Sequence, residues 1–392
     1  QTIRQYLFFT LVVRFGTSFT MSTYVLFLMS KGLNLFEVNL VNFTYFTTLF
    51  LFEVPTGIVA DVFGRKLSYV LSSIVFGSAF FIYAASDSLP GFLLAEATAA
   101  VGTTLATGAF QAWLVDRLNY FGFRGSLDGL FAREQLISNL ATIGGAVMGG
   151  ALATIGFAVP WVVGGAVVFA SGVVAAFVMK EEYFTRRRFS MRANVRAMFD
   201  TVRTSLSFGR GSSVVKFVAG MGILQLFAVQ APNMQWQPFF SQFFSGTFGM
   251  GLIFGGISAA LAMGALLAPR LVRTIRLESQ ALVWTQVAIG IGIIAASLTR
   301  TLPAALAVFL LHEVARGVYR PLRDAYLNHH IPSLERATLL SLAANANNAG
   351  AMVGLLISGF VAEMYSIPVA WMLGGSVLII GTLVLVKRNG YQ

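Results

Sequence analysis

Twelve long apolar stretches, separated by short polar turns, form the hydrophobic pattern of this chain. Each has about 20 residues or more, the length that an α-helix needs to cross roughly 30 Å of hydrocarbon. Apolar runs of this length are not typical of soluble cores. The pattern therefore predicts an all-α polytopic membrane protein with transmembrane helices near residues 4–30, 35–60, 67–86, 91–115, 130–154, 158–179, 212–238, 246–269, 278–299, 302–324, 338–362 and 367–386.

One long polar segment, 181–211, divides the chain into two halves of six predicted spans each, 1–180 and 212–392. Its arginines alternate with apolar residues at helical spacing, which predicts a basic amphipathic linker helix on the cytoplasmic membrane surface. An RNA-binding arm has a similar composition, but the position between two halves favours a linker.

The two halves resemble each other when one is shifted by about 210 positions along the other. Glycines and a tryptophan then coincide: Gly144, Gly149, Trp161, Gly164 and Gly165 fall on Gly354, Gly359, Trp371, Gly374 and Gly375. This repeat predicts two pseudo-symmetric six-helix bundles.

The positive charge of the chain follows from its predicted topology. Only 11% of the residues are charged, and the formal net charge is +11. With both termini cytoplasmic, the short outer turns carry only Lys31 and Arg300, and nearly every other basic residue outside the spans lies inside. We therefore expect a multi-pass protein of the cell membrane (inner or plasma) with cytoplasmic termini, and no nucleic-acid partner. The chain has no cysteine, which excludes disulfides and thiolate metal sites.

A conspicuous motif, G-x-x-x-D-x-x-G-R-K, lies between the second and third spans and contains Gly57, Asp61, Gly64, Arg65 and Lys66. Gly57 leaves room for two helices to touch, and Gly64 permits a tight turn. Asp61 is expected to face a positive helix N-terminus, and the basic pair holds the turn on the cytoplasmic side. The motif resembles the signature loop of the major facilitator superfamily, and the resemblance covers essentially the whole chain. It implies twelve helices in two bundles, with this loop as a conformational gate.

Charged side chains inside a span cost a few kcal/mol or more, so they are candidates for function. In the first two spans, Arg14 and Glu53 reach similar depths on neighbouring helices, and we predict that they form an ion pair. This pair has two interpretations: a structural clamp for the Asp61 turn, or a role in proton coupling.

Glu96, in the fourth span, precedes Gly102 by six positions. In the family's fourth-span motif, R-x-x-Q-G-x-G, an arginine associated with proton coupling stands there, so the charge is inverted in this chain. Glu96 is interpreted as a proton carrier, as a cation-binding group, or as a side chain that reaches the outer interface.

The tenth span carries His312, Glu313 and Arg316 near the middle of the bilayer. Glu313 and Arg316 are three residues apart and can pair on one helix face, either for proton coupling or simply to neutralise each other. The family resemblance implies that the first, fourth, seventh and tenth spans line a central cavity. That cavity would contain Arg14, Glu96, Gln111, Gln225, Gln230, His312, Glu313 and Arg316.

The leading functional hypothesis is a secondary active transporter that works by alternating access and exports a small amphipathic or cationic organic compound in exchange for protons. The family's antiporter motif G-P-x-x-G-G occurs at 145–150 without its proline, which weakens the export interpretation. The alternatives are a proton symporter of an organic anion bound by Arg14 and Arg316, and a membrane receptor or enzyme on a similar scaffold. The expected partners are the substrate, protons and the lipid bilayer, with a monomeric protein that is not an enzyme and has no metal or cofactor.

Overall fold

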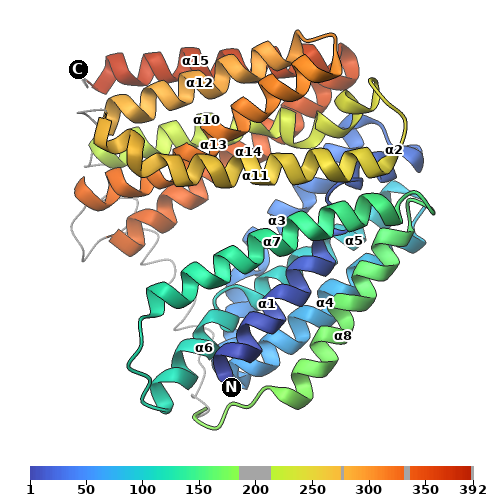
Figure 1. The fold of residues 1–392 in the computed structure, drawn as a ribbon, viewed down its shortest axis with the longest axis vertical. Coiled ribbons are helices and arrows are strands. Elements are labelled where there is room, and N and C mark those ends of the chain that lie inside the picture. Colours follow the sequence, from blue (N-terminus) through green and yellow to red (C-terminus); the bar gives the residue numbers. More distant parts are fainter. Residues whose placement is uncertain (185–212, 275–277, 331–335, 390–392) are drawn as a thin grey trace. The chain divides into compact units, whose positions relative to one another are not determined.

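The structure, a computed structural model, describes residues 1–184, 213–274, 278–330 and 336–389, which contain no β-strand. Within this part of the chain, ten helical segments are long and apolar enough to cross a membrane, so the prediction of an all-α membrane protein is confirmed. Figure 1 shows the helices, whose bounds are α1 Thr2–Ser18, α2 Tyr24–Ser30, α3 Leu35–Phe63, α4 Arg65–Ala85, α5 Leu89–Ala106, α6 Ala109–Tyr120, α7 Leu127–Leu152, α8 Val159–Val178, α10 Ser213–Ser241, α11 Thr247–Thr274, α12 Glu278–Ser297, α13 Leu302–His330, α14 Arg336–Met364 and α15 Ile367–Asn389.

The first predicted span is not one continuous helix, because turns at residues 19–23 separate α1 from α2. Hydroxyl groups at the break bond to the backbone of α1: Ser18 Oγ donates to Arg14 O at 2.6 Å, and Thr20 Oγ1, within the break, donates to Thr17 O at 3.4 Å. Such local bonds compete with regular helical bonding and favour an interruption.

The fourth predicted span is also divided, into α5 and α6. Gly108 has a φ of +74°, a left-handed conformation that glycine adopts without steric cost. The joint between the two helices therefore lies at 107–108, in the middle of the predicted span.

The described chain forms two compact units, which are treated separately below. Unit 1 comprises Gln1–Leu33, Val41–Phe189 and Phe244–Ser258, and unit 2 comprises Asn34–Leu40, Ser190–Phe243 and Ala259–Gln392. Most of the predicted amphipathic linker, from residue 185 onward, lies outside the described residues.

In unit 1, α4 packs against α5 and α8, while α1 packs against α7 and α8. The α1 and α7 backbones approach closely at Gly149, where an added Cβ would lie 1.9 Å from the carbonyl oxygen of Phe19. Trp161 is buried and stacks on Tyr83, with ring centroids 4.1 Å apart. Small residues at contacts and an aromatic core hold this unit together.

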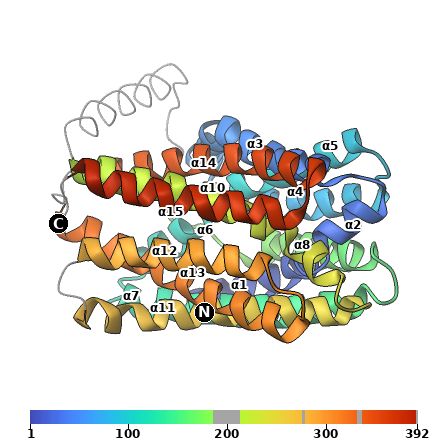
Figure 2. The same cartoon turned by 90° about the horizontal axis from the view of Figure 1, so that it is seen from above.

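Unit 2 repeats the helix pairing of unit 1, as Figure 2 shows for α10, α14 and α15. Here α10 packs against α14 and α15, and α12 packs against α13 and α15. Trp371 is buried in contact with Phe239, at a centroid distance of 4.6 Å, in the place that Trp161 has in unit 1. The structure therefore bears out the two related helical bundles that the sequence repeat predicts.

Candidate functional site

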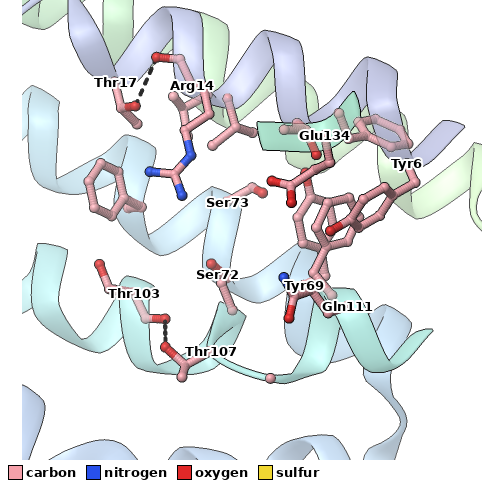
Figure 3. Close-up of a pocket in the computed structure, with 18 of the residues that line it drawn as sticks. Tyr6, Arg14, Thr17, Tyr69, Ser72, Ser73, Thr103, Thr107, Gln111 and Glu134 are labelled. Carbon is pink, nitrogen blue, oxygen red and sulfur yellow. Dashed lines mark hydrogen bonds between the residues drawn. The ribbon is translucent and has the colours of Figure 1, made fainter. Parts of the chain in front are cut away.

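Unit 1 contains a cavity of about 440 Å³ lined by residues of α1, α3, α4, α5, α6, α7 and α8. Figure 3 shows that the side chains of Arg14, from α1, and Glu134, from α7, both point into it. Its volume is within the range of pockets that bind small organic ligands. This cavity is therefore a candidate binding site of unit 1.

Polar side chains without charge line much of the cavity. Gln111 belongs to the lining, and hydroxyl groups come from α1, α4, α5 and the joint after α5: Thr10, Thr17, Ser72, Ser73, Thr103 and Thr107. The arrangement offers several hydrogen-bond donors and acceptors to a ligand.

The wall near Glu134 and Gln111 is aromatic (Figure 3). Phe110 is sandwiched between two tyrosines, with ring centroids 4.5 Å from Tyr6 and 4.1 Å from Tyr69. Tyr6 and Tyr69 are almost fully buried and hold the half-buried ring of Phe110 in place, so Phe110 is the part of this rigid stack against which the apolar part of a ligand can pack.

Arg14 and Glu134 interact electrostatically, yet among the described residues neither has an ion-pair partner within 4.0 Å. The predicted ion pair between Arg14 and Glu53 is absent: Glu53 is exposed on α3 and does not line the cavity. The prediction was wrong because similar depth on neighbouring helices does not make side chains face each other.

Glu134 is the cavity residue that sequence reasoning missed. It lies in the predicted fifth span, 130–154, one turn from its beginning, and an inventory of charges within that span would have found it.

Glu96 lies outside the cavity lining. Its side chain is buried, with 8% of the residue exposed, and the hydroxyl of Tyr83 donates a hydrogen bond to its carboxylate. Tyr83 is also in contact with the hydroxyl of Tyr24 at 3.3 Å, which accepts a hydrogen bond from Asn42 Nδ2 at 3.0 Å. Glu96 thus contacts Tyr83 and does not line the cavity of unit 1, and its burial argues against the alternative of a side chain at the outer interface.

In unit 2, Glu313 and His312 are each only 1% exposed. Arg316 Nη1 donates to Glu313 Oε1 at 2.8 Å and to Asn233 Oδ1 at 2.9 Å, which confirms the predicted pairing on one helix face. Glu313 Oε2 and both ring nitrogens of His312 have no hydrogen-bond partner among the described residues.

Gln225, on α10 of the same unit, is 8% exposed. The structure thus brings Arg14 and Gln111 together in unit 1, while the other predicted cavity residues of the seventh and tenth spans belong to unit 2.

The signature loop is held by a residue that the motif does not include. Glu181 accepts hydrogen bonds from the backbone N–H groups of Arg65, at 2.8 Å, and Lys66, at 3.0 Å, at the N-terminus of α4. Gly64, the residue before α4, has a φ of +101°, as its predicted role in a tight turn requires. A carboxylate at this position satisfies free N–H groups and interacts favourably with the helix dipole.

Arg65 completes this network through its side chain. Its guanidinium forms an ion pair with Asp116 and donates to Ala112 O at 2.8 Å, so α4 is joined to α6. Asp61 lines a small hollow of about 160 Å³ beside Arg65, Asp116 and Glu181. The helix N-terminus predicted to face Asp61 is thus capped by Glu181 instead.

Gly57 does not form the close helix contact predicted from the motif. A Cβ built at this position meets no atom of the described residues within 4 Å. The reason for glycine at this position is therefore not packing in this structure.

The segment that follows α8 is anchored to α6. Trp113 Nε1 donates to Lys180 O at 3.0 Å, and Tyr183 Oη donates to Trp113 O at 3.1 Å. Burial raises the pKa of the Tyr183 phenol, and the carboxylates of Glu181 and Asp116 raise it further. Tyr183 therefore remains protonated and keeps its donor role at physiological pH.

These features agree with comparisons to known proteins. The family described as the Major Facilitator Superfamily matches residues 6–283 and 222–390. The chain therefore belongs to the Major Facilitator Superfamily: it is a multi-pass membrane transporter and not an enzyme.

Among relatives, the chain is similar to "Uncharacterized MFS-type transporter YxaM" of Bacillus subtilis (strain 168), with 23% identity over 372 residues, 91% of this chain and 88% of that protein. Among solved structures, it is similar to the nucleoside transporter NupG, with a TM-score of 0.81, 13% identity and 100% of both chains covered. A D-xylose-proton symporter has a TM-score of 0.72 and 14% identity over 98% of this chain and 96% of that chain. At these identities the structural likeness shows the fold alone.

Proposed function

We propose that this chain is a secondary active transporter that works by alternating access and exchanges protons for a small amphipathic organic solute with a cationic group. The observation that carries the proposal is the cavity of unit 1, where the Glu134 carboxylate lies beside an aromatic wall. A carboxylate attracts the cationic group, and the aromatic wall accepts the apolar part of the solute.

We assign proton coupling to the buried residues His312 and Glu313 of α13, together with Arg316, which pairs with Glu313. Glu313 shares one oxygen with Arg316, while its second oxygen has no partner among the described residues. Buried ionisable groups in membrane spans are typical of proton relays. His312, next to Glu313 and equally buried, is a second group through which a proton can pass.

The contacts of the signature loop support its role as a conformational gate. Arg65 joins α4 to α6 through Asp116, and Glu181 binds the N-terminus of α4. In this proposal, these contacts break when the cytoplasmic end of unit 1 moves. Lys66 and Asp61, at the same end, belong to the gate in this proposal.

A proton symporter of an organic anion is the second candidate, because Arg14 faces the cavity without an ion-pair partner among the described residues. Arg316, the other proposed anion ligand, already bonds to Glu313 and Asn233, which argues against this role. Membership of a transporter family argues against a receptor.

The remaining features of the proposal follow from the charge pattern and the repeat. We place the protein in the cell membrane as a monomer with cytoplasmic termini, with bundles 1–180 and 212–392 joined by the 181–211 linker.

The test uses the purified protein in liposomes. Counterflow of three labelled probes (tetraphenylphosphonium, phenylalanine and hydrocinnamate) is measured first, and then accumulation driven by an imposed pH gradient. We expect counterflow of at least one cationic or zwitterionic probe, and accumulation that follows the gradient.

Glu313→Gln should abolish accumulation but retain counterflow, because coupling is lost while the pathway remains. Asp324→Asn, which removes an exposed carboxylate on the same helix, is the matched control and should behave as wild type. The proposal fails if no probe shows counterflow, if only hydrocinnamate does, or if the gradient has no effect on the wild type.

A further inference from the structure

Two opposite charges in one small cavity are the starting point. Arg14 and Glu134 extend from α1 and α7 into the same 440 Å³ space, and no direct ion pair within 4.0 Å joins them in the described structure. Each therefore has hydrogen-bonding capacity that its partner does not use. Arg14 is exposed and Glu134 is half-buried, so both charges contact solvent in the cavity. A ligand that fills the cavity displaces this solvent, and because a charge without water or a partner is costly, the ligand has to compensate both groups.

The surroundings of the two charges differ. Figure 3 shows Glu134 near Tyr6, Tyr69 and Gln111, and Arg14 near Thr17, away from this aromatic group. The cavity is thus divided into a carboxylate end with a rigid aromatic wall and a guanidinium end. Ser73 lies between the two ends in the same view.

A ligand with a single charge matches only half of this site. A cation satisfies Glu134 but leaves Arg14 uncompensated, and an anion does the reverse. A zwitterion satisfies both: its carboxylate accepts from the fork of the guanidinium, and its ammonium group donates to Glu134.

We propose that the Arg14 and Glu134 cavity selects zwitterionic solutes, with the ligand carboxylate at Arg14, the ligand ammonium at Glu134 and the apolar body on the wall of Tyr6, Phe110 and Tyr69. This inference rests on the proposed function, since it names the substrate class of the transporter's cavity. The solute must then carry an anionic group for Arg14 in addition to the cationic group for Glu134.

The test compares matched sets of probes by calorimetry on the full chain in detergent. One set is phenylalanine, its methyl ester and hydrocinnamate, and the other is para-aminomethylbenzoate, its methyl ester and para-toluate. Each set contains a zwitterion, the same molecule without the anionic charge, and the same body without the ammonium. We expect at least one zwitterion to bind about tenfold or more tightly than both its analogues, as the loss of a hydrogen bond to a charged group predicts.

Two variants separate the roles of the charges. Arg14→Gln should bind the ester as well as the zwitterion, and Glu134→Gln should bind the deaminated acid as well as the zwitterion. Lys31→Gln and Asp87→Asn, which change an ion pair of unit 1 outside the cavity, are the matched controls and should keep the wild-type preference. Melting temperatures near that of the wild type show that the variants fold.

The inference is overturned if no probe binds, if the analogues bind as tightly as the zwitterions, or if both variants retain the wild-type preference. Counterflow in liposomes separates this result from the proposed transport. A zwitterion preference without counterflow supports the site and refutes the transport proposal, whereas counterflow of the ester but not of the zwitterion refutes the site alone.

Discussion

Replacing Glu181 by alanine tests how the signature loop is held. The carboxylate accepts two backbone N–H groups, from Arg65 at 2.8 Å and Lys66 at 3.0 Å, and Gly64 provides no side-chain cap. Hydrogen bonds to charged groups contribute about 1.5–3 kcal/mol, and loss of a helix N-cap costs about 0.5–2 kcal/mol. Because Glu181 is half-buried and solvent replaces part of the interaction, we expect a loss of about 1–2 kcal/mol.

The assay is reversible unfolding of the purified protein in mixed detergent, followed by circular dichroism, together with amide hydrogen exchange of the peptide that contains Arg65 and Lys66. Exchange of this peptide should become faster in Glu181→Ala, because the two amides lose their acceptor. Glu182→Ala is the matched control: it removes the neighbouring carboxylate, which pairs with Arg117 at 3.3 Å and does not cap a helix. Because Arg117 is buried, Glu182→Ala has a cost in stability of its own, but it should leave the exchange of the Arg65 and Lys66 amides unchanged.

Unchanged exchange at the start of α4 in Glu181→Ala, or equally faster exchange in Glu182→Ala, would refute the capping role. An intermediate result for Glu181→Gln is expected, since the amide oxygen still accepts one hydrogen bond but has no charge.

Two further substitutions test the interior of unit 1. Gly149→Ala should destabilise the protein by about 1–3 kcal/mol, because the added methyl group overlaps the carbonyl oxygen of Phe19; an unchanged unfolding midpoint would contradict this close approach. Tyr83→Phe keeps the ring stacked on Trp161 but removes the hydroxyl that donates to Glu96, and should cost about 1–3 kcal/mol in the same unfolding assay. The same substitution is also made in a Glu96→Gln background. If Tyr83→Phe costs as much stability there as in the wild type, the hydrogen bond does not depend on the charge of the carboxylate.

The fold was predictable from the sequence because its main determinants are local. Span length and apolar content identify the membrane helices, and the shift of about 210 residues reveals the repeated bundle. The break between α1 and α2 was not predicted, although the hydroxyl groups of Ser18 and Thr20 make local bonds that favour an interruption.

The site was only partly predictable, because it depends on side-chain direction and on contacts between distant positions. Arg14 and Gln111, which the family resemblance placed in a cavity, line the cavity of unit 1, whereas Glu134, near the beginning of its helix, was overlooked. Glu181 is 116 positions from Arg65, and no periodicity links the two. A buried carboxylate such as Glu96 can be recognised from sequence, but whether it faces a cavity or a tyrosine is decided by packing.

The joint at Gly108 has a mechanical consequence. It frees α6 from the line of α5, and this short helix carries Gln111 at the cavity, Ala112 and Asp116 at the Arg65 contact, and Trp113 at the anchored segment after α8. A helix of about three turns is expected to move as a rigid rod. A ligand that displaces the end of α6 near Gln111 should therefore displace the end near Asp116 as well. We therefore expect occupation of the cavity to be coupled, through α6, to the contact between Arg65 and Asp116.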